Sequence, residues 1–129
     1  MKISDGFWLN KPGYEVNYAT QIYEVNVTEN SINLLVTQQY IQNRGMTLGG
    51  PVFDITFTST LEDSIKVTIE HFKGRLKKGP CFELNEDKSF KPVITHDENG
   101  YTLTSGKTSV KIGNQGGSWD VAYSYGDKL

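Results

Sequence analysis

A chain of 129 residues fits a single domain, 1–129, that can bury a core without stabilisation by disulfide bonds or a bound metal. Its hydrophobic residues (36%) and aromatic residues (12%) come with frequent glycine, a balance that favours strands and turns over helices. A formal net charge of -2 gives no basic field of the kind that nucleic acids and anionic membranes attract, so neither is an expected partner.

The single cysteine, Cys81, bears on the cellular compartment. One cysteine forms no intrachain disulfide, which excludes a disulfide-stapled secreted fold. The first residues are polar and charged where a signal peptide needs an apolar core, and no apolar stretch approaches the length of a membrane span. These features predict a cytoplasmic location.

Apolar and polar residues alternate with a period of two along the first half of the chain, which predicts strands with one buried face. One predicted hairpin joins residues 23–27 to 32–37, and a second, with the cleanest pattern, joins 53–58 to 65–70. The expected buried row consists of Tyr23, Val25, Val27, Ile32, Leu34, Val36, Phe53, Ile55, Phe57, Ile65, Val67 and Ile69.

The second half continues in the same way. Residues 93–95 and 101–103 flank an Asn-Gly dipeptide, which is typical of hairpin turns, and residues 110–112 and 119–125 follow with further alternation. Short strands therefore recur at intervals of roughly ten residues, and no amphipathic helix is evident. We expect an all-β fold, an antiparallel sandwich or barrel.

The last predicted strand carries three aromatic residues in phase, for which a core row is the favoured interpretation: Trp119, Tyr123 and Tyr125. The chain then ends with a turn pair and two residues of a returning strand. Natural domains avoid unpaired strand edges of this kind. The ending therefore predicts a piece of a larger domain that self-associates through its exposed edge.

Several short segments, in order along nearly the whole chain, together carry a resemblance to a known family. They are residues 1–9, Pro12-Gly13, residues 44–48 with Pro51, residues 69–74, Gly79-Pro80, Leu84-Asn85 and residues 105–110. The chain resembles the amino-terminal region of bacterial α-xylosidases of glycoside hydrolase family 31.

This resemblance implies a β-sandwich of the galactose-mutarotase-like type that precedes a (β/α)8 barrel. In that family the barrel supplies two aspartates for retaining cleavage of α-linked xylose or glucose. The nucleophile motif has no counterpart here, and the family's amino-terminal domain is longer than this chain, so we expect an incomplete sandwich without catalytic residues. Its expected role is to support the absent barrel and subunit contacts of a retaining α-glycosidase. The alternative is a carbohydrate-binding module of weak affinity, and an isolated enzyme such as an epimerase ranks last.

Acidic and histidine residues offer no catalytic constellation. The acidic pairs Glu62-Asp63, Glu86-Asp87 and Asp97-Glu98 fall at turns, which lack the apolar pocket that raises one carboxyl pKa. Mutarotase chemistry needs a histidine and a glutamate on one sugar, but Glu70 and His71 are adjacent on a strand and point to opposite faces. We expect His71 to be hydrogen-bonded at the end of the core-facing row and His96 to lie on the surface.

Metals and cofactors are not expected, because two histidines and one cysteine have no ligand-like spacing. Lys77 and Lys78 can lower the thiol pKa of nearby Cys81, but lone cysteines are mostly buried small apolar residues, and that is the favoured interpretation.

Two long loops, 38–50 and 74–82, are the places where function is expected to lie. Their basic residues form either solvated loop tips or a domain or subunit interface: Arg44, Arg75, Lys77 and Lys78. Exposed aromatic rings stack on sugars, and the candidates for this role are Trp8 and Tyr40.

Overall fold

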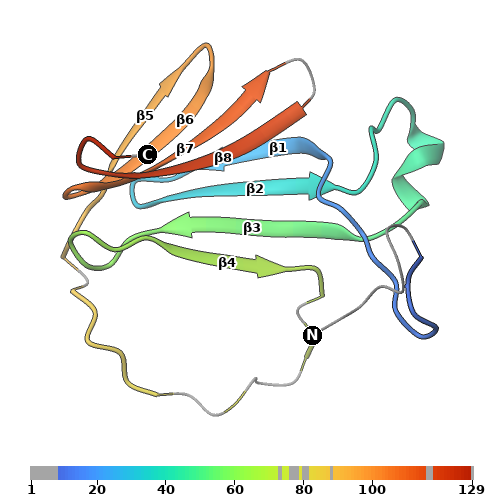
Figure 1. The fold of residues 1–129 in the computed structure, drawn as a ribbon, viewed down its shortest axis with the longest axis horizontal. Helices are drawn as coiled ribbons and strands as arrows, with labels where there is room; N and C mark the ends of the chain where they lie inside the picture. The colour runs from blue at the N-terminus through green and yellow to red at the C-terminus, as the bar shows by residue number, and fades with distance from the viewer. Residues whose placement is uncertain are drawn as a thin grey trace.

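The computed structural model describes residues 9–72, 74, 75, 79, 82–87, 89–115 and 118–128. Within them the chain forms two four-stranded antiparallel sheets and one short 3-10 helix, η1 (Arg44–Leu48) (Figure 1). The first sheet has the order β1 (Gln21–Val27), β2 (Ser31–Thr37), β3 (Val52–Thr58) and β4 (Lys66–Glu70). The second has the order β5 (Val93–Asp97), β6 (Gly100–Ser105), β7 (Thr108–Gln115) and β8 (Ser118–Tyr125). The predicted all-β antiparallel sandwich is confirmed.

The two sheets share one core. In the first sheet Ile32 lies opposite Phe57 and Leu34 opposite Ile55, and in the second sheet Leu103 lies opposite Val110. The buried cluster draws on both sheets: Ile32, Leu34, Val36, Ile55, Phe57, Leu103, Val110 and Ile112. Complete burial of a side chain of this size stabilises the fold by about 1.5–3 kcal/mol, so this cluster holds the two sheets together.

A β-bulge changes the expected buried row of β1. The pairing of β1 with β2 shifts between Ile22 and Glu24, so Tyr23 is an extra residue. Ile22 and Val25 therefore pack against the core, whereas Tyr23 and Val27 are exposed. The prediction that Tyr23 and Val27 belong to the buried row is wrong. The bulge turns Tyr23 to the other face of the sheet, whereas Val27 keeps the core-side position opposite Ile32 but is exposed at the end of β1.

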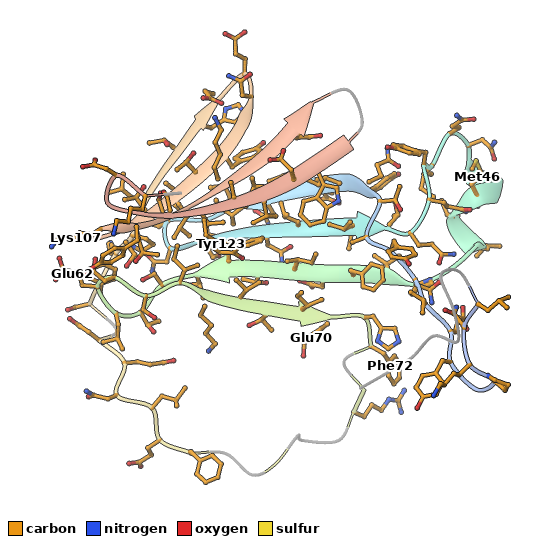
Figure 2. The ribbon with its side chains drawn as sticks, viewed as in Figure 1. Met46, Glu62, Glu70, Phe72, Lys107 and Tyr123 are labelled. Atoms are coloured by element: carbon orange, nitrogen blue, oxygen red, sulfur yellow. The ribbon has the colours of Figure 1, made fainter. Side chains whose placement is uncertain are left out.

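Polar contacts connect the turn after β3 with the turn of the β6–β7 hairpin. The buried hydroxyl Oγ of Ser59 donates to Ser105 Oγ at 2.9 Å, and both hydroxyls lie 2.9 Å from the Leu61 carbonyl oxygen. Asp63, with a positive φ of 61°, accepts a hydrogen bond from the Lys107 N–H through its side chain. These contacts fix the two sheets at this end of the sandwich (Figure 2).

The last strand is buried at its beginning and exposed at its end. Trp119 and Val121 pack against the core, and the Trp119 indole N–H donates to the Ala19 carbonyl oxygen at 3.0 Å. Tyr123 and Tyr125 are exposed, so the predicted core row of β8 is right for Trp119 and wrong for the two tyrosines. The predicted return of the chain is present as a single bridge between Tyr125 and Lys128.

β4 is the edge strand of the first sheet, and in Figure 1 it lies at the side of that sheet away from β5 to β8. Val67 and Ile69 lie opposite the buried Phe57 and Ile55 but are themselves exposed. His71, which follows them, is also exposed. The predictions that Val67 and Ile69 are buried and that His71 ends a core-facing row are therefore wrong, because the second sheet does not cover β4.

Candidate functional site

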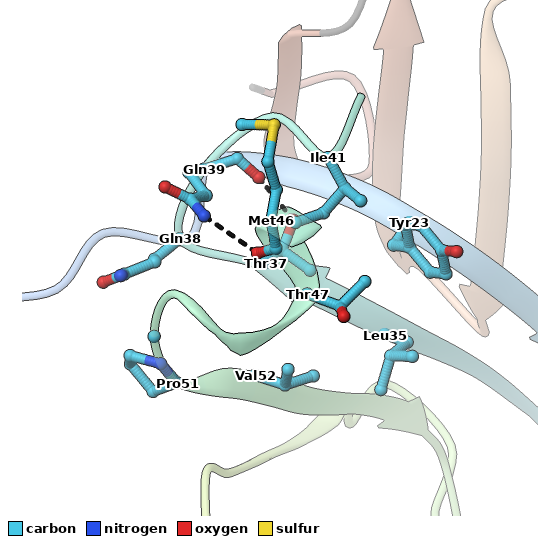
Figure 3. Close-up of a pocket in the computed structure, with 11 residues that line it drawn as sticks. Tyr23, Leu35, Thr37, Gln38, Gln39, Ile41, Met46, Thr47, Pro51 and Val52 are labelled. Carbon is cyan, nitrogen blue, oxygen red and sulfur yellow. Dashed lines mark hydrogen bonds between the residues drawn. The ribbon is translucent and has the colours of Figure 1, made fainter. Parts of the chain in front are cut away.

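A pocket of about 200 Å³ lies on the outer face of the first sheet (Figure 3). It forms where the loop between β2 and β3, which includes η1, folds back over the ends of β1, β2 and β3. Its lining residues are Tyr23, Leu35, Thr37, Gln38, Gln39, Ile41, Met46, Thr47, Gly50, Pro51 and Val52. Tyr23 reaches this face because of the bulge in β1.

Side-chain amides hold the loop in place. Gln39 Nε2 donates to the Met46 carbonyl oxygen at 3.0 Å, and Gln38 Nε2 donates to the Gly49 carbonyl oxygen at 2.7 Å. From β1, Gln21 Oε1 accepts a hydrogen bond from the Ile41 N–H at 2.8 Å. These bonds satisfy backbone groups that the irregular loop leaves unpaired, so the loop has a defined shape although it has little regular structure.

η1 begins with a capping interaction, since the Asn43 side chain accepts a hydrogen bond from the Gly45 N–H at 3.0 Å. A Cβ added at Gly50 would lie 1.7 Å from Gln38 Nε2, so the bare glycine backbone leaves room for that amide. The Gly49-Gly50-Pro51 break therefore lets the loop return to β3 beside the glutamines.

The pocket is suited to an apolar group rather than to acid–base chemistry. Leu35, Ile41, Met46, Pro51 and Val52 supply hydrocarbon surface, and the Nε2 groups of the two glutamines are already bonded to backbone carbonyls. The lining residues include no carboxylate and no histidine. A glycosidase site needs two carboxyl groups across the scissile bond, and this pocket does not provide them.

Of the described interface and stacking candidates, Tyr40 and Arg44 share the loop between β2 and β3, and Arg75 lies apart from them after β4. Arg44 is exposed at the start of η1, Arg75 is exposed after β4, and Tyr40 is exposed in the loop before η1. None of these three lines the pocket. Trp8, Lys77, Lys78 and also Cys81 lie outside the described residues. The interface and stacking roles stay predictions.

Two of the acidic turn residues, Asp63 and Asp87, accept hydrogen bonds from neighbouring residues. Asp63 accepts from the Lys107 N–H, and Asp87 accepts from the side chain of Ser89 at 2.6 Å and from its backbone N–H at 2.9 Å. The Ser89 hydroxyl, followed by the Ser89 N–H, lowers the pKa of the Asp87 carboxyl below its ordinary value. A lowered pKa keeps this carboxyl ionised, which is unsuitable for a general acid.

The exposed His96 ring lies beside Tyr101, with ring centroids 4.5 Å apart, as expected of a surface histidine. In the part of the chain that the structure describes, no three histidine, cysteine or acidic residues form a group able to hold a metal ion. The same residues contain no helix long and apolar enough to cross a membrane.

Sequence reasoning missed the pocket because its residues come from four separate segments. The bulge that exposes Tyr23 has no proline or glycine signal, and the amide contacts of Gln21, Gln38 and Gln39 depend on how the loop folds. Two signals were available: the long loop 38–50, where function was expected, and the Gly-Gly-Pro break at 49–51, where the chain turns sharply.

Fold and pocket together define a β-sandwich with a largely apolar pocket on the outer face of its first sheet. No family model matches the chain. It is 30% identical over 112 residues to an alpha-xylosidase of Emericella nidulans and 34% identical over 112 residues to alpha-xylosidase XylQ of Lactiplantibacillus pentosus. Each match covers 87% of this chain but only 14% of the relative. The resemblance to α-xylosidases is confirmed, and the chain spans a small part of these relatives.

Proposed function

We propose that this chain is a non-catalytic β-sandwich domain of an α-xylosidase-like glycosidase, whose parent polypeptide cleaves α-linked xylosides or glucosides with retention. Both named relatives are α-xylosidases, and the matched segment is a small fraction of each. The observation that carries the proposal is the makeup of the pocket, whose lining holds neither a histidine nor the two carboxyl groups that retaining cleavage of a glycoside requires.

The domain's role in this proposal is to support the catalytic barrel and neighbouring subunits. The loop over the pocket presents apolar side chains to solvent, including Leu48 at 91% exposure, with Tyr40 and Val52 also exposed. Exposed apolar side chains grouped on a hydrogen-bonded loop are typical of an interface, and Arg44 adds a charge beside them.

The test compares the chain with the longer polypeptide that its reading frame encodes. Nitrophenol release from nitrophenyl α-xyloside is expected from the longer polypeptide and not from residues 1–129 alone. In the longer polypeptide, Leu48→Ser is expected to lower the free energy of unfolding, while Val93→Ser on β5, a matched exposed control at 62%, leaves it unchanged. Hydrolysis by residues 1–129, or a frame that encodes no further domain, would overturn the proposal.

A carbohydrate-binding module is the second candidate, because Tyr40 presents an exposed ring on an ordered loop. Titration of the chain with xylose, isoprimeverose or maltose would then give saturable shifts in amide resonances that disappear in Tyr40→Ala. Shifts that are absent, or that persist in Tyr40→Ala, would remove Tyr40 as a sugar-stacking residue.

A further inference from the structure

The inward face of the edge strand β4 carries apolar side chains that the described residues leave exposed. Ile69 is 63% exposed, although it lies directly opposite Ile55, which is buried. Phe72, just after the strand, is 77% exposed, and Val67 opposite the buried Phe57 is also exposed. We call Val67 and Ile69 the β4 face; Figure 2 labels Phe72, which follows the strand.

The two faces of β4 differ in polarity. Val67 and Ile69 alternate with Lys66, Thr68 and Glu70, so one face is apolar and the other polar. Alternation of this kind specifies a strand with one face packed and one face in water. Each Å² of apolar surface left in water costs about 25 cal/mol relative to burial, and an exposed apolar edge strand promotes aggregation. The sequence thus suits a strand whose inward face is covered.

The β4 face continues the core rather than forming a separate patch. Cross-strand neighbours on one side of a sheet form one row, and the row through Ile55 and Phe57 enters the shared core on β3 and reaches Ile69 and Val67 on β4. Ile65, just before the strand, still packs against the core. The second sheet therefore ends too early to cover the C-terminal half of β4.

The described residues of the segment that follows β4 do not supply the cover. Lys66 forms an ion pair with Glu86 at 3.7 Å, and the Asp87 N–H donates to the Thr60 carbonyl oxygen at 2.9 Å, so this segment returns to the beginning of β4. Its apolar residues Phe82 and Leu84 remain exposed.

We propose that a further β-strand of the parent polypeptide, outside residues 1–129, packs across the β4 face and extends the shared core. This inference rests on the proposed function. The curated relatives supply the argument for this occupant, because the matched segment is 14% of their length, so most of a similar polypeptide lies outside it. An apolar face continuous with a core is covered more readily by the apolar face of another strand than by a polar ligand.

The test measures access to the β4 face by alkylation of a single cysteine. In a Cys81→Ser background, Ile69→Cys is placed in residues 1–129 and in the longer polypeptide encoded by the same reading frame. Val93→Cys is the matched control, because Val93 on β5 is 62% exposed and Ile69 is 63% exposed. Val67→Cys provides a second site on the β4 face should Ile69→Cys disturb folding, which circular dichroism would reveal.

Iodoacetamide is expected to modify Ile69→Cys at least roughly tenfold more slowly in the longer polypeptide than in residues 1–129, since thiol reactivity follows exposure. Val93→Cys is expected to react equally in both. Equal reactivity of Ile69→Cys in the two polypeptides would overturn the inference. If that polypeptide still hydrolyses nitrophenyl α-xyloside, the proposed function survives the failure.

Two other segments could cover the β4 face, and each would change the alkylation rate of Ile69→Cys in residues 1–129 in its own way. Either result would also overturn the inference. A second copy of the chain would slow the alkylation of Ile69→Cys as the protein concentration rises. The segment after β4, closing over the strand, would slow it at every concentration.

Discussion

Gly100 begins β6 with a backbone φ of 139°, and a Cβ added there would lie 2.0 Å from the Ile112 carbonyl oxygen. Because both the conformation and the space exclude a side chain, Gly100→Ala is expected to destabilise the fold by about 3 kcal/mol or more. Gly126→Ala is the control, since its φ of 56° carries strain but nothing lies within 4 Å of the added Cβ. It should lose only about 1 kcal/mol. Urea unfolding measures both, and equal losses would contradict the steric argument.

Asp87 makes the free energy of unfolding depend on pH in the acidic range. The Ser89 hydroxyl and N–H lower the pKa of its carboxyl, so the folded state binds the proton less readily than the unfolded state. The stabilisation is therefore complete above the unfolded-state pKa and is lost as pH falls through the lowered folded-state pKa.

Ser89→Ala removes the largest of these causes and is expected to raise the pKa of Asp87 toward its ordinary value. Side-chain carboxyl resonances followed by NMR across acidic pH measure the change. Ser64→Ala, in the turn before β4, should leave the Asp87 pKa as it is. An unchanged pKa in Ser89→Ala would show that the serine hydroxyl is not the cause.

At the scale of elements, Asp63 in the turn between β3 and β4 is one of the residues that join the two sheets. Asp63 has a positive φ, accepts from the Lys107 N–H, and its carbonyl oxygen accepts from Thr108 Oγ1 at 2.9 Å. Asp63→Ala loses the side-chain acceptor and keeps the strained backbone, so it is expected to destabilise the fold by about 2–3 kcal/mol.

Asp63→Asn provides the matched comparison, because asparagine tolerates a positive φ and keeps an oxygen acceptor. Its loss is expected to be about 1 kcal/mol, since the acceptor is no longer charged. Thermal or urea unfolding of both variants separates the two effects. Equal losses in Asp63→Ala and Asp63→Asn would show that the bond to Lys107 contributes nothing.

The elements differ in how far the sequence predicts them, for reasons that individual residues make clear. The β2 and β3 strands follow their pattern because Leu34 and Ile55 face a covering sheet. The β1 bulge changes which face Tyr23 occupies, and no local residue signals it. Ile69 has the same alternation as its buried partner, but its exposure depends on what lies over β4, which a local pattern does not contain.

At the scale of the whole molecule, the sandwich depends on side chains from both sheets meeting in one cluster. Phe57 and Leu103 are buried in the same core, and the Ser59 and Ser105 hydroxyls join the sheets at its edge. Neither sheet has a separate core of its own among the described residues. Because an isolated sheet would expose its apolar face, the two sheets are expected to unfold together.

Leu103→Ala tests this cooperativity. Removal of this buried side chain on β6 is expected to lower the free energy of unfolding by about 2–5 kcal/mol. Both sheets should be destabilised equally. The opening free energy that hydrogen exchange measures should therefore fall by the same amount for the most protected amides of β2 and of β7. Thr102→Ala, the preceding residue on β6, points away from the core and should change stability by less than about 0.5 kcal/mol. If β7 lost protection while β2 kept it, the sheets would be separate folding units.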